Sequence, residues 1–300
     1  MTDFILSIEG TEFGHKLAMI LALVSAVAHA VFGALQKGRY DPWLTRGAID
    51  IFYCLMALPI ALFVFPMPDA HLWLLLAGAW VIHVAYKWFM AKAYERAAYT
   101  VVYPVVRGIG PLVTVIFAGF VFDEVFSPIQ WLGVALLSGA IFALAGWNLR
   151  KATVDRQILW GALGFAGVTG ILVAVYTTYD AFGMRAATDP FTFLFWFFVI
   201  DGWVFPIIAY LRWQKMEVTP PLKPLLQRGF IGASIAFVSF GSVMLATRLD
   251  KVGEAAVLRE TSTVFAALIG WLFLKETVGP VRATLMAIIA AGAVIVEFGG

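Results

Sequence analysis

The sequence predicts an all-α integral membrane protein with ten transmembrane helices, arranged as two inverted five-helix repeats. Three observations carry this expectation. Of the 300 residues, 62% are hydrophobic and only 13% are charged, with a mean hydropathy of +0.89, whereas a soluble domain carries about 25% charged residues. Apolar stretches long enough to cross a bilayer recur along the chain. Polar residues at matching places in the two halves indicate an internal duplication.

Ten segments meet the requirement of about 20 mostly apolar residues for a bilayer span. Turn signals such as Asp41-Pro42 and Asp189-Pro190 mark the short connections between them. A hydrophilic break near residue 150 divides the spans five and five, so we expect one repeat over residues 1–150 and another over 151–300. An odd number of spans per repeat inverts one repeat relative to the other. The expected spans are 16–36, 47–66, 71–91, 99–122, 127–148, 157–181, 190–211, 228–247, 254–274 and 279–297.

One span in each half contains an arginine. An offset of 152 residues relates Arg107 to Arg259, and the same offset relates Glu124 to Glu276. An arginine at hydrocarbon depth costs about 2.5–3.5 kcal/mol on insertion scales, so it normally faces protein or water. The pattern predicts a polar path between the two halves. Further correspondences at offsets of 152 and 144 residues are Pro128 with Pro280, Ser25 with Thr169, Phe32 with Tyr176, and Gln36 with Asp180.

Lysine and arginine near the span ends are distributed unevenly between the two sides of the membrane. One side carries 13 of them: Lys37, Arg39, Arg46, Lys92, Arg96, Arg150, Lys151, Arg156, Arg212, Lys215, Lys223, Arg228 and Lys275. The other side carries 4: Lys16, Arg185, Arg248 and Lys251. The positive-inside rule places the richer side in the cytoplasm and both termini outside.

Enzyme and nucleic-acid functions find no support in the sequence. Cys54 is the one cysteine, so a disulfide framework or cysteine metal site is not expected. The chain has no His-Glu-x-x-His motif, no glycine-rich phosphate loop and no basic run. We therefore expect no catalytic residue, no metal, no cofactor, no nucleic-acid partner and no ATP-driven pumping.

Two short patterns carry a resemblance to a known family. The first is the segment Tyr103-Pro104-Val105-Val106-Arg107-Gly108-Ile109-Gly110-Pro111. The second is the span ending Phe122-Asp123-Glu124 followed by Pro128, which is repeated by Leu274-Lys275-Glu276 and Pro280. In these features the chain resembles the drug/metabolite transporter superfamily, in its ten-span branch with two EamA domains.

The resemblance covers nearly the whole chain and says nothing of the substrate. It implies a central cavity lined by the fourth and ninth spans, favours export, and makes the proton gradient a candidate driver. It also implies that both termini lie in the cytoplasm, against the charge count, so the orientation stays open.

Candidate substrate-binding residues lie in three spans. The planar guanidinium of Arg107 or Arg259 matches a carboxylate or phosphate. The alternative is an arginine that pairs with a neighbouring carboxylate or extends to the interface. The full set of candidates is Arg107, Arg259, Tyr103, Thr114, Ser262, Thr263 and Lys87.

Proton coupling is expected at buried acids or histidines. Asp201 lies about eleven residues from either end of its span, where a carboxylate is protonated or paired. Glu260 points about 100° away from Arg259 around the helix, so the two face different neighbours. Histidine is the side chain that ordinarily titrates nearest neutral pH, which makes His83 and His29 further candidates. The alternative is a histidine hydrogen-bonded in a helix interface. Asp50 and Asp180 are expected to be surface or pairing residues, and Glu124 and Glu276 to be structural joints.

Proline and glycine in the fourth span predict a kink that serves as a gate. The alternative is ordinary transmembrane packing, in which both residue types are common. The residues concerned are Pro104, Gly108, Gly110 and Pro111.

We expect a secondary active transporter that moves a small polar metabolite by alternating access, such as an amino acid or another zwitterionic or anionic compound. Its partners would be this substrate and the lipid bilayer, with the chain as a monomer or homodimer. It would be multi-pass in the cell membrane, the inner membrane of a bacterium. Two alternatives are an efflux transporter for lipophilic cations and a non-transporting membrane protein, such as a lipid-flipping or scaffold component.

Overall fold

The computed structural model describes residues 1–36, 41–97, 99–150, 156–272 and 279–300, and all regular elements among them are α-helices. Glu276, part of the predicted repeat, lies outside these residues. The helices are α1 (Thr2–Ile8), α2 (Glu12–Gln36), α3 (Pro42–Phe63), α4 (Ala70–Arg96), α5 (Tyr99–Phe122), α6 (Pro128–Leu149), α7 (Arg156–Ala186), α8 (Pro190–Asp201), α9 (Val204–Trp213), α10 (Leu222–Leu249), α11 (Val252–Arg259), α12 (Ser262–Leu272) and α13 (Pro280–Phe298).

Nine helical stretches of the described residues are long and apolar enough to cross a membrane. α8 and α9 together form one of them, Pro190–Trp213. The expected span 254–274 is not among the nine, because α11 ends at Arg259 and α12 begins at Ser262. The all-helical multi-pass architecture expected from the sequence is confirmed, with the ninth span interrupted in its middle.

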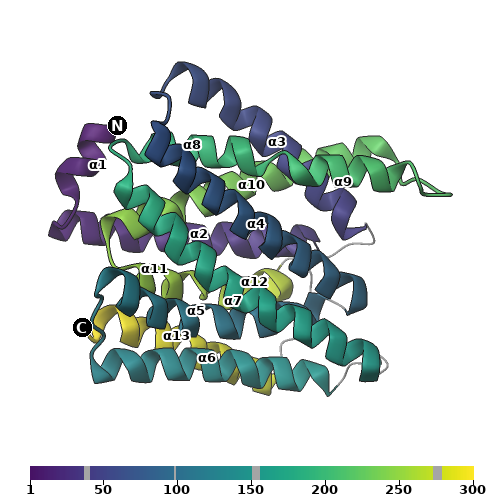
Figure 1. The fold of residues 1–300 in the computed structure, drawn as a ribbon. Helices are drawn as coiled ribbons and strands as arrows, with labels where there is room; N and C mark the ends of the chain where they lie inside the picture. The colour runs from purple at the N-terminus through teal and green to yellow at the C-terminus, as the bar shows by residue number, and fades with distance from the viewer. Residues whose placement is uncertain (37–40, 98, 151–155, 273–278) are drawn as a thin grey trace.

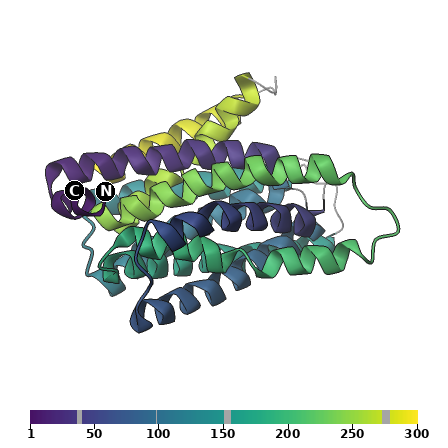
Figure 2. The same ribbon diagram turned by 90° about the horizontal axis from the view of Figure 1, so that it is seen from above.

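The long helices lie side by side, and both termini lie at the same end of the bundle (Figures 1 and 2). We call this end the terminal end. The opposite end, where α2, α4, α6 and α9 finish, is called the basic end. Its described basic residues include Arg46, Lys92, Arg96, Arg150, Arg212, Lys215, Lys223, Arg228 and Arg282.

The packing between helices repeats with a two-fold relation. α2 packs along α10, and α4 packs along α7. α5 packs against α7, and α11 and α12 pack against α2. Counted as spans, α2 with α10 is the pair one–eight and α4 with α7 is the pair three–six. Likewise α5 with α7 is four–six, and α11 and α12 with α2 is nine–one. Replacing each span by its counterpart in the other half, five spans away, turns one–eight into six–three and four–six into nine–one. Two further pairs, α6 with α13 and α3 with α8 and α9, join a span to its own counterpart.

Several helices begin where the sequence places a capping residue. The Asp41 carboxylate accepts hydrogen bonds from the backbone N–H groups of Trp43 (2.8 Å) and Leu44 (3.2 Å), and Pro42 occupies the first helical position of α3. Asp189 and Pro190 open α8 in the same way. These carboxylates satisfy N–H groups that have no partner within the helix.

The outside of the bundle is strongly apolar, as a lipid-facing surface must be. Large side chains such as Phe63 (85% exposed) and Phe120 (83% exposed) point outward. Inside, close approaches between helices depend on small residues, as in other membrane helix pairs. A Cβ atom on Gly133 of α6 would lie 2.7 Å from the carbonyl oxygen of Gly292 in α13.

Candidate functional site

A cavity of about 270 Å³ lies between α2, α3, α4, α5 and α7. Its lining runs from Tyr176 and Arg107 near the middle of the bundle to Pro42 and Ala97, where α3 begins and α4 has ended. The cavity therefore extends toward the basic end. The other lining residues are His29, Phe32, Gly33, Thr45, Arg46, Ile49, Tyr86, Lys87, Met90, Ala91, Tyr94, Tyr103, Val106 and Val173.

The polar side chains that line this cavity are cationic or aromatic, apart from the Thr45 hydroxyl. Arg46, Lys87 and Arg107 contribute three cations, and no carboxylate of the described residues is among the lining groups. His29 also lines it, and its ring stacks on that of Tyr103 at 6.2 Å between centroids. The surface offered to a ligand is one that attracts negative charge.

The carboxylates lie behind the cations. The Lys87 ammonium donates to Asp50 (2.7 Å), to Asp201 (2.6 Å) and to the Tyr53 hydroxyl (2.7 Å). Arg46 lies 2.6 Å from the other oxygen of Asp50. Asp201 ends α8, where the helix is interrupted before α9, and its backbone carbonyl also accepts from Lys87 at 3.1 Å.

A second buried ion pair joins α5 to the interruption in the ninth span. Arg107 donates to Glu260 at 2.6 Å, and Glu260 lies in the gap between α11 and α12. The Arg107 guanidinium also lies over the Tyr103 ring, 5.2 Å from its centroid. Arg107 therefore pairs with a neighbouring carboxylate, which was the alternative to substrate binding for these arginines. The same side chain also lines the cavity.

Arg259 occupies a separate place. It is 3% exposed, and its guanidinium lies 4.9 Å from the centroid of the Phe240 ring. Its Nε and Nη2 atoms have no hydrogen-bond partner among the described residues. A small pocket beside it is lined by Tyr176 and Asp180. Tyr176, which lines both spaces, stands between this pocket and the main cavity.

His83 and Asp180 form the third buried pair. The His83 Nε2 atom lies 2.8 Å from the Asp180 carboxylate, and both side chains are almost fully buried. The imidazole packs against the rings of Tyr176 (4.4 Å) and Phe197 (4.6 Å). His83 is not a lining residue of the cavity, so the structure separates it from His29.

Three of the buried pairs join the two halves of the chain, whereas Lys87 with Asp50 lies within the first half. In each of the three, the nitrogen base belongs to the first half and the carboxylate to the second, and they are Lys87 with Asp201, His83 with Asp180, and Arg107 with Glu260. A buried ion pair is weak evidence for stability, because desolvation offsets its Coulomb energy. Three such pairs concentrate buried charge at the interface between the two halves.

The other predicted residues lie near the cavity or in helix contacts. Ser262 lies with its hydroxyl 3.4 Å from that of Tyr103. Thr114 donates to the carbonyl of Gly110 in its own helix, and the Thr263 hydroxyl is buried with no hydrogen-bond partner among the described residues. α5 is helical throughout, through Pro104 and Pro111.

The glycines of α5 face neighbouring helices. A Cβ on Gly108 would meet the Phe142 ring at 2.9 Å, and one on Gly110 would meet Val173 at 3.3 Å. These contacts support the packing alternative for the glycines. Within the described part of the chain, two spans are interrupted, at Gly202–Trp203 and at Glu260–Thr261.

Sequence reasoning missed part of the lining. Tyr86, Met90 and Tyr94 follow one face of α4 at four-residue steps, and this spacing could have identified the stripe. Arg46 and Asp50 are also four residues apart, and Asp50 is fully buried and paired rather than at the surface.

At the terminal end the two halves are closed together by polar contacts. Asp123 turns the chain with a φ of 54°, and Glu124 accepts from the backbone N–H groups of Val252 (2.7 Å) and Gly253 (3.0 Å) at the start of α11. Burial raises the pKa of the Glu124 carboxyl, and the two N–H donors oppose that rise. Gln130 donates to Glu254 at 2.8 Å. The bundle is therefore hollow toward the basic end and sealed at the terminal end.

A model of the EamA-like transporter family matches residues 16–146 and again residues 159–298. No curated protein matches the sequence. Among solved structures 29 chains match, and one crystal structure, at 16% sequence identity, has a TM-score of 0.72 over 96% of this chain and 99% of its own. At that identity the likeness shows the fold alone. The two family matches fall on the two halves that the packing relates, and this chain belongs to the EamA-like transporter family of the drug/metabolite transporter superfamily, as a multi-pass membrane transporter.

Proposed function

We propose that the protein is a secondary active transporter that carries a small anionic or zwitterionic metabolite, such as an amino acid, by alternating access. The cavity lining supports this best, because Arg46, Lys87 and Arg107 face the cavity and no described carboxylate does. A guanidinium binds a carboxylate or phosphate with two parallel hydrogen bonds. The tyrosine rings beside the cations would contact the apolar part of the ligand.

The Arg107–Glu260 pair supplies a way to couple binding to movement. A substrate carboxylate that binds Arg107 competes with Glu260, and so weakens a contact between the halves. A proton on Glu260 weakens the same contact. We therefore rank Glu260 first among the coupling candidates, with Asp201 in the same role at Lys87, and His83 and His29 after them.

Arg259 would bind the substrate in the other state of the transport cycle, in which the terminal end is open. The repeat places it in the second half where Arg107 stands in the first, and its pocket lies between α7 and α10 toward the terminal end. A buried guanidinium with two unpartnered nitrogen atoms is costly. An anion arriving there when the terminal end opens would relieve that cost.

The positive-inside rule assigns the basic end to the cytoplasm. In that orientation the cavity loads from the cytoplasm, which suits export driven by the proton gradient across a bacterial inner membrane. We propose one such cavity per chain, so a monomer would hold one site and a homodimer two.

Efflux of lipophilic cations fits the site less well. A cation would need carboxylates on the cavity surface, whereas Asp50 and Asp201 are bound to Lys87 and Glu260 is bound to Arg107. A scaffold role without transport has no feature of the cavity in its favour, and the family is one of transporters.

The test is thermal unfolding of the purified protein in detergent with a panel of amino acids, phosphorylated metabolites, organic anions and quaternary cations. A ligand that binds the folded state raises its apparent stability. Stabilisation by anions or zwitterions should be present in the wild type and lost in Arg107→Gln. Arg282→Gln is the matched control, because Arg282 bonds Asn148 away from the cavity. Stabilisation by cations alone, equal in all three proteins, would refute the proposal.

A further inference from the structure

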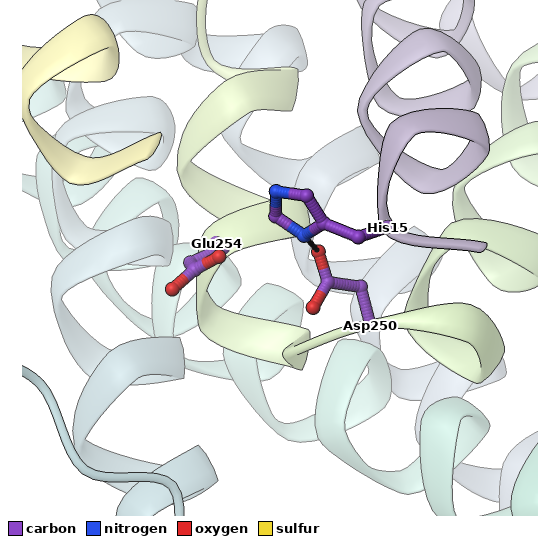
Figure 3. Close-up of side chains that lie close together, drawn as sticks. All are labelled: His15, Asp250 and Glu254. Atoms are coloured by element: carbon purple, nitrogen blue, oxygen red, sulfur yellow. Dashed lines mark hydrogen bonds and ion pairs between the residues drawn. The ribbon is translucent and has the colours of Figure 1, made fainter. Parts of the chain in front are cut away.

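A second cluster of charged side chains lies at the terminal end, far from the cavity. It contains His15 from the start of α2, Asp250 after α10, and Glu254 from α11, and one ligand atom from each lies within 4.8 Å of the others (Figure 3). The His15 Nδ1 atom is 2.5 Å from Asp250. Its other ring nitrogen, Nε2, is 3.5 Å from the carboxylate of Glu297 near the end of α13.

Glu297 adds to the cluster a buried carboxylate that has no hydrogen bond within the described part of the chain. Its side chain is 2% exposed, and neither of its carboxylate oxygens has a hydrogen-bond partner among the described residues. A buried carboxylate in this condition is strongly destabilising unless a proton or a cation joins it. This group points toward His15 and hence into the cluster.

The charges in the cluster do not balance. Asp250, Glu254 and Glu297 contribute three negative charges, and among the described residues Lys251 is the one lysine or arginine within ion-pair distance of them, at 2.9 Å from Glu254. Glu254 also accepts from Gln130 through the same oxygen atom. With His15 neutral, as a metal ligand is, two negative charges remain, which a divalent cation would neutralise.

We propose that His15, Asp250 and Glu254 bind a divalent transition-metal ion such as Zn²⁺, with the Glu297 carboxylate beside the second ring nitrogen of His15. One imidazole with carboxylate oxygens is a ligand set that Zn²⁺ accepts, at about 2.0–2.2 Å from each atom. Two ligands of one Zn²⁺ stand farther apart than the 2.5 Å that now separates His15 Nδ1 from Asp250, so the ion would move this pair apart and draw Glu254 toward it. His15 can supply that movement because its side chain is 42% exposed.

The position of this site gives the ion a consequence for transport. His15 belongs to the first half, whereas Asp250, Glu254 and Glu297 belong to the second, and all four lie at the sealed end. An ion that bridges the halves there keeps that end shut and stops the cycle. This consequence rests on alternating access, whereas the binding of the ion does not.

Binding is tested with tag-free protein freed of metal by a chelator. Zn²⁺ at about 100-fold excess over its Kd should raise the unfolding temperature by several degrees, and Mg²⁺ at the same concentration should not. The shift should be lost in His15→Ala and reduced in the isosteric Glu297→Gln. The control is His71→Ala, because His71 is an exposed histidine at the same end of the bundle and its loss should leave the shift intact. Equal shifts in the wild type and His15→Ala, or no shift in the wild type, would overturn the site.

The effect of the ion on transport is tested in liposomes that contain the purified protein. Uptake is measured for a ligand identified by the thermal unfolding panel. Zn²⁺ should block uptake by the wild type and leave His15→Ala active. Zn²⁺ binding without inhibition would refute the proposed closure of the terminal end by the ion and would leave the binding site supported. Absence of uptake without Zn²⁺ would count against the proposed transport function alone, since the binding result stands independently of it.

Discussion

Lys87 is held between carboxylates from both halves, with Asp50 at 2.7 Å and Asp201 at 2.6 Å. Its side chain is 1% exposed, so none of the three charges is screened by bulk water. Removal of one member of a buried ion pair leaves an uncompensated charge, which costs more than the pair contributes. Single substitutions here should therefore be severe, and double substitutions milder.

Lys87→Met should destabilise the protein by about 3–5 kcal/mol, because it leaves Asp50 and Asp201 without their cation. Adding Asp201→Asn should restore part of that loss, because it removes one of the two abandoned charges. Chemical unfolding in detergent measures both effects. Lys16→Met is the control, with Lys16 62% exposed and an expected change within about 0.5 kcal/mol. Additive losses in the double variant would contradict the pairing.

Glu260→Gln should lower the unfolding temperature without ligand, because Arg107 loses its anionic partner at 2.6 Å. The same change should increase stabilisation by anions, since the internal competitor for the guanidinium is gone. Thermal unfolding with and without the best anion checks both directions. An unchanged or weaker anion response would show that Glu260 does not compete with the substrate.

At the scale of elements, two spans are interrupted where a carboxylate stands. α8 ends at Asp201 and α11 ends next to Glu260. An interruption is tolerated at membrane depth only where the exposed backbone lines a cavity or is buried in protein. Here the Asp201 carbonyl accepts from Lys87. The two interrupted spans therefore bring backbone and side-chain acceptors to the cations of the first half.

The contact between α6 and α13 gives a test of packing within one helix. Gly133→Ala should destabilise the protein by about 1–3 kcal/mol, because the new Cβ would lie 2.7 Å from the Gly292 carbonyl oxygen. Gly139→Ala, also in α6, meets nothing within 4 Å, and should be neutral or stabilising by up to about 1 kcal/mol. Unfolding of the two variants side by side checks this. Equal stability would contradict the close approach of these helices.

At the scale of the whole molecule, the bundle is hollow toward one end and sealed at the other. The cavity lining reaches Pro42 and Ala97 at the basic end, while Glu124 and Gln130 join the halves at the terminal end. Transport by alternating access requires the reverse arrangement as well. The two-fold relation in the packing supplies it, because exchanging the conformations of the two halves exchanges the open and sealed ends.

Orientation is decided by labelling single cysteines in intact cells, in a chain whose buried Cys54 is replaced by alanine. The positive-inside rule predicts that Lys16→Cys at the terminal end reacts with an impermeant maleimide and Lys215→Cys at the basic end does not. Both positions are exposed. Lysed cells provide the control in which both react. The reverse pattern would place the termini in the cytoplasm, as the family resemblance implies.

Much of the fold could be predicted from the sequence, because spanning a bilayer imposes length and apolarity on each helix separately. Arg107 and Arg259, which lie 152 residues apart at matching places in the two halves, likewise indicate the duplication from the sequence alone. The site could be predicted only as a set of polar residues. Arg107, Lys87 and His29 do line the cavity, whereas His83 and Arg259 do not.

The sequence by itself determined an all-helical membrane protein of two related halves with charged residues in its interior. The tertiary structure decided which charges meet: Lys87 with Asp201, and Arg107 with Glu260. It also decided that cations face the cavity while carboxylates stand behind them. The reason is physical. Hydropathy and periodicity act along one helix, whereas the partner of a buried charge depends on the rotation and depth of a second helix far away in the chain.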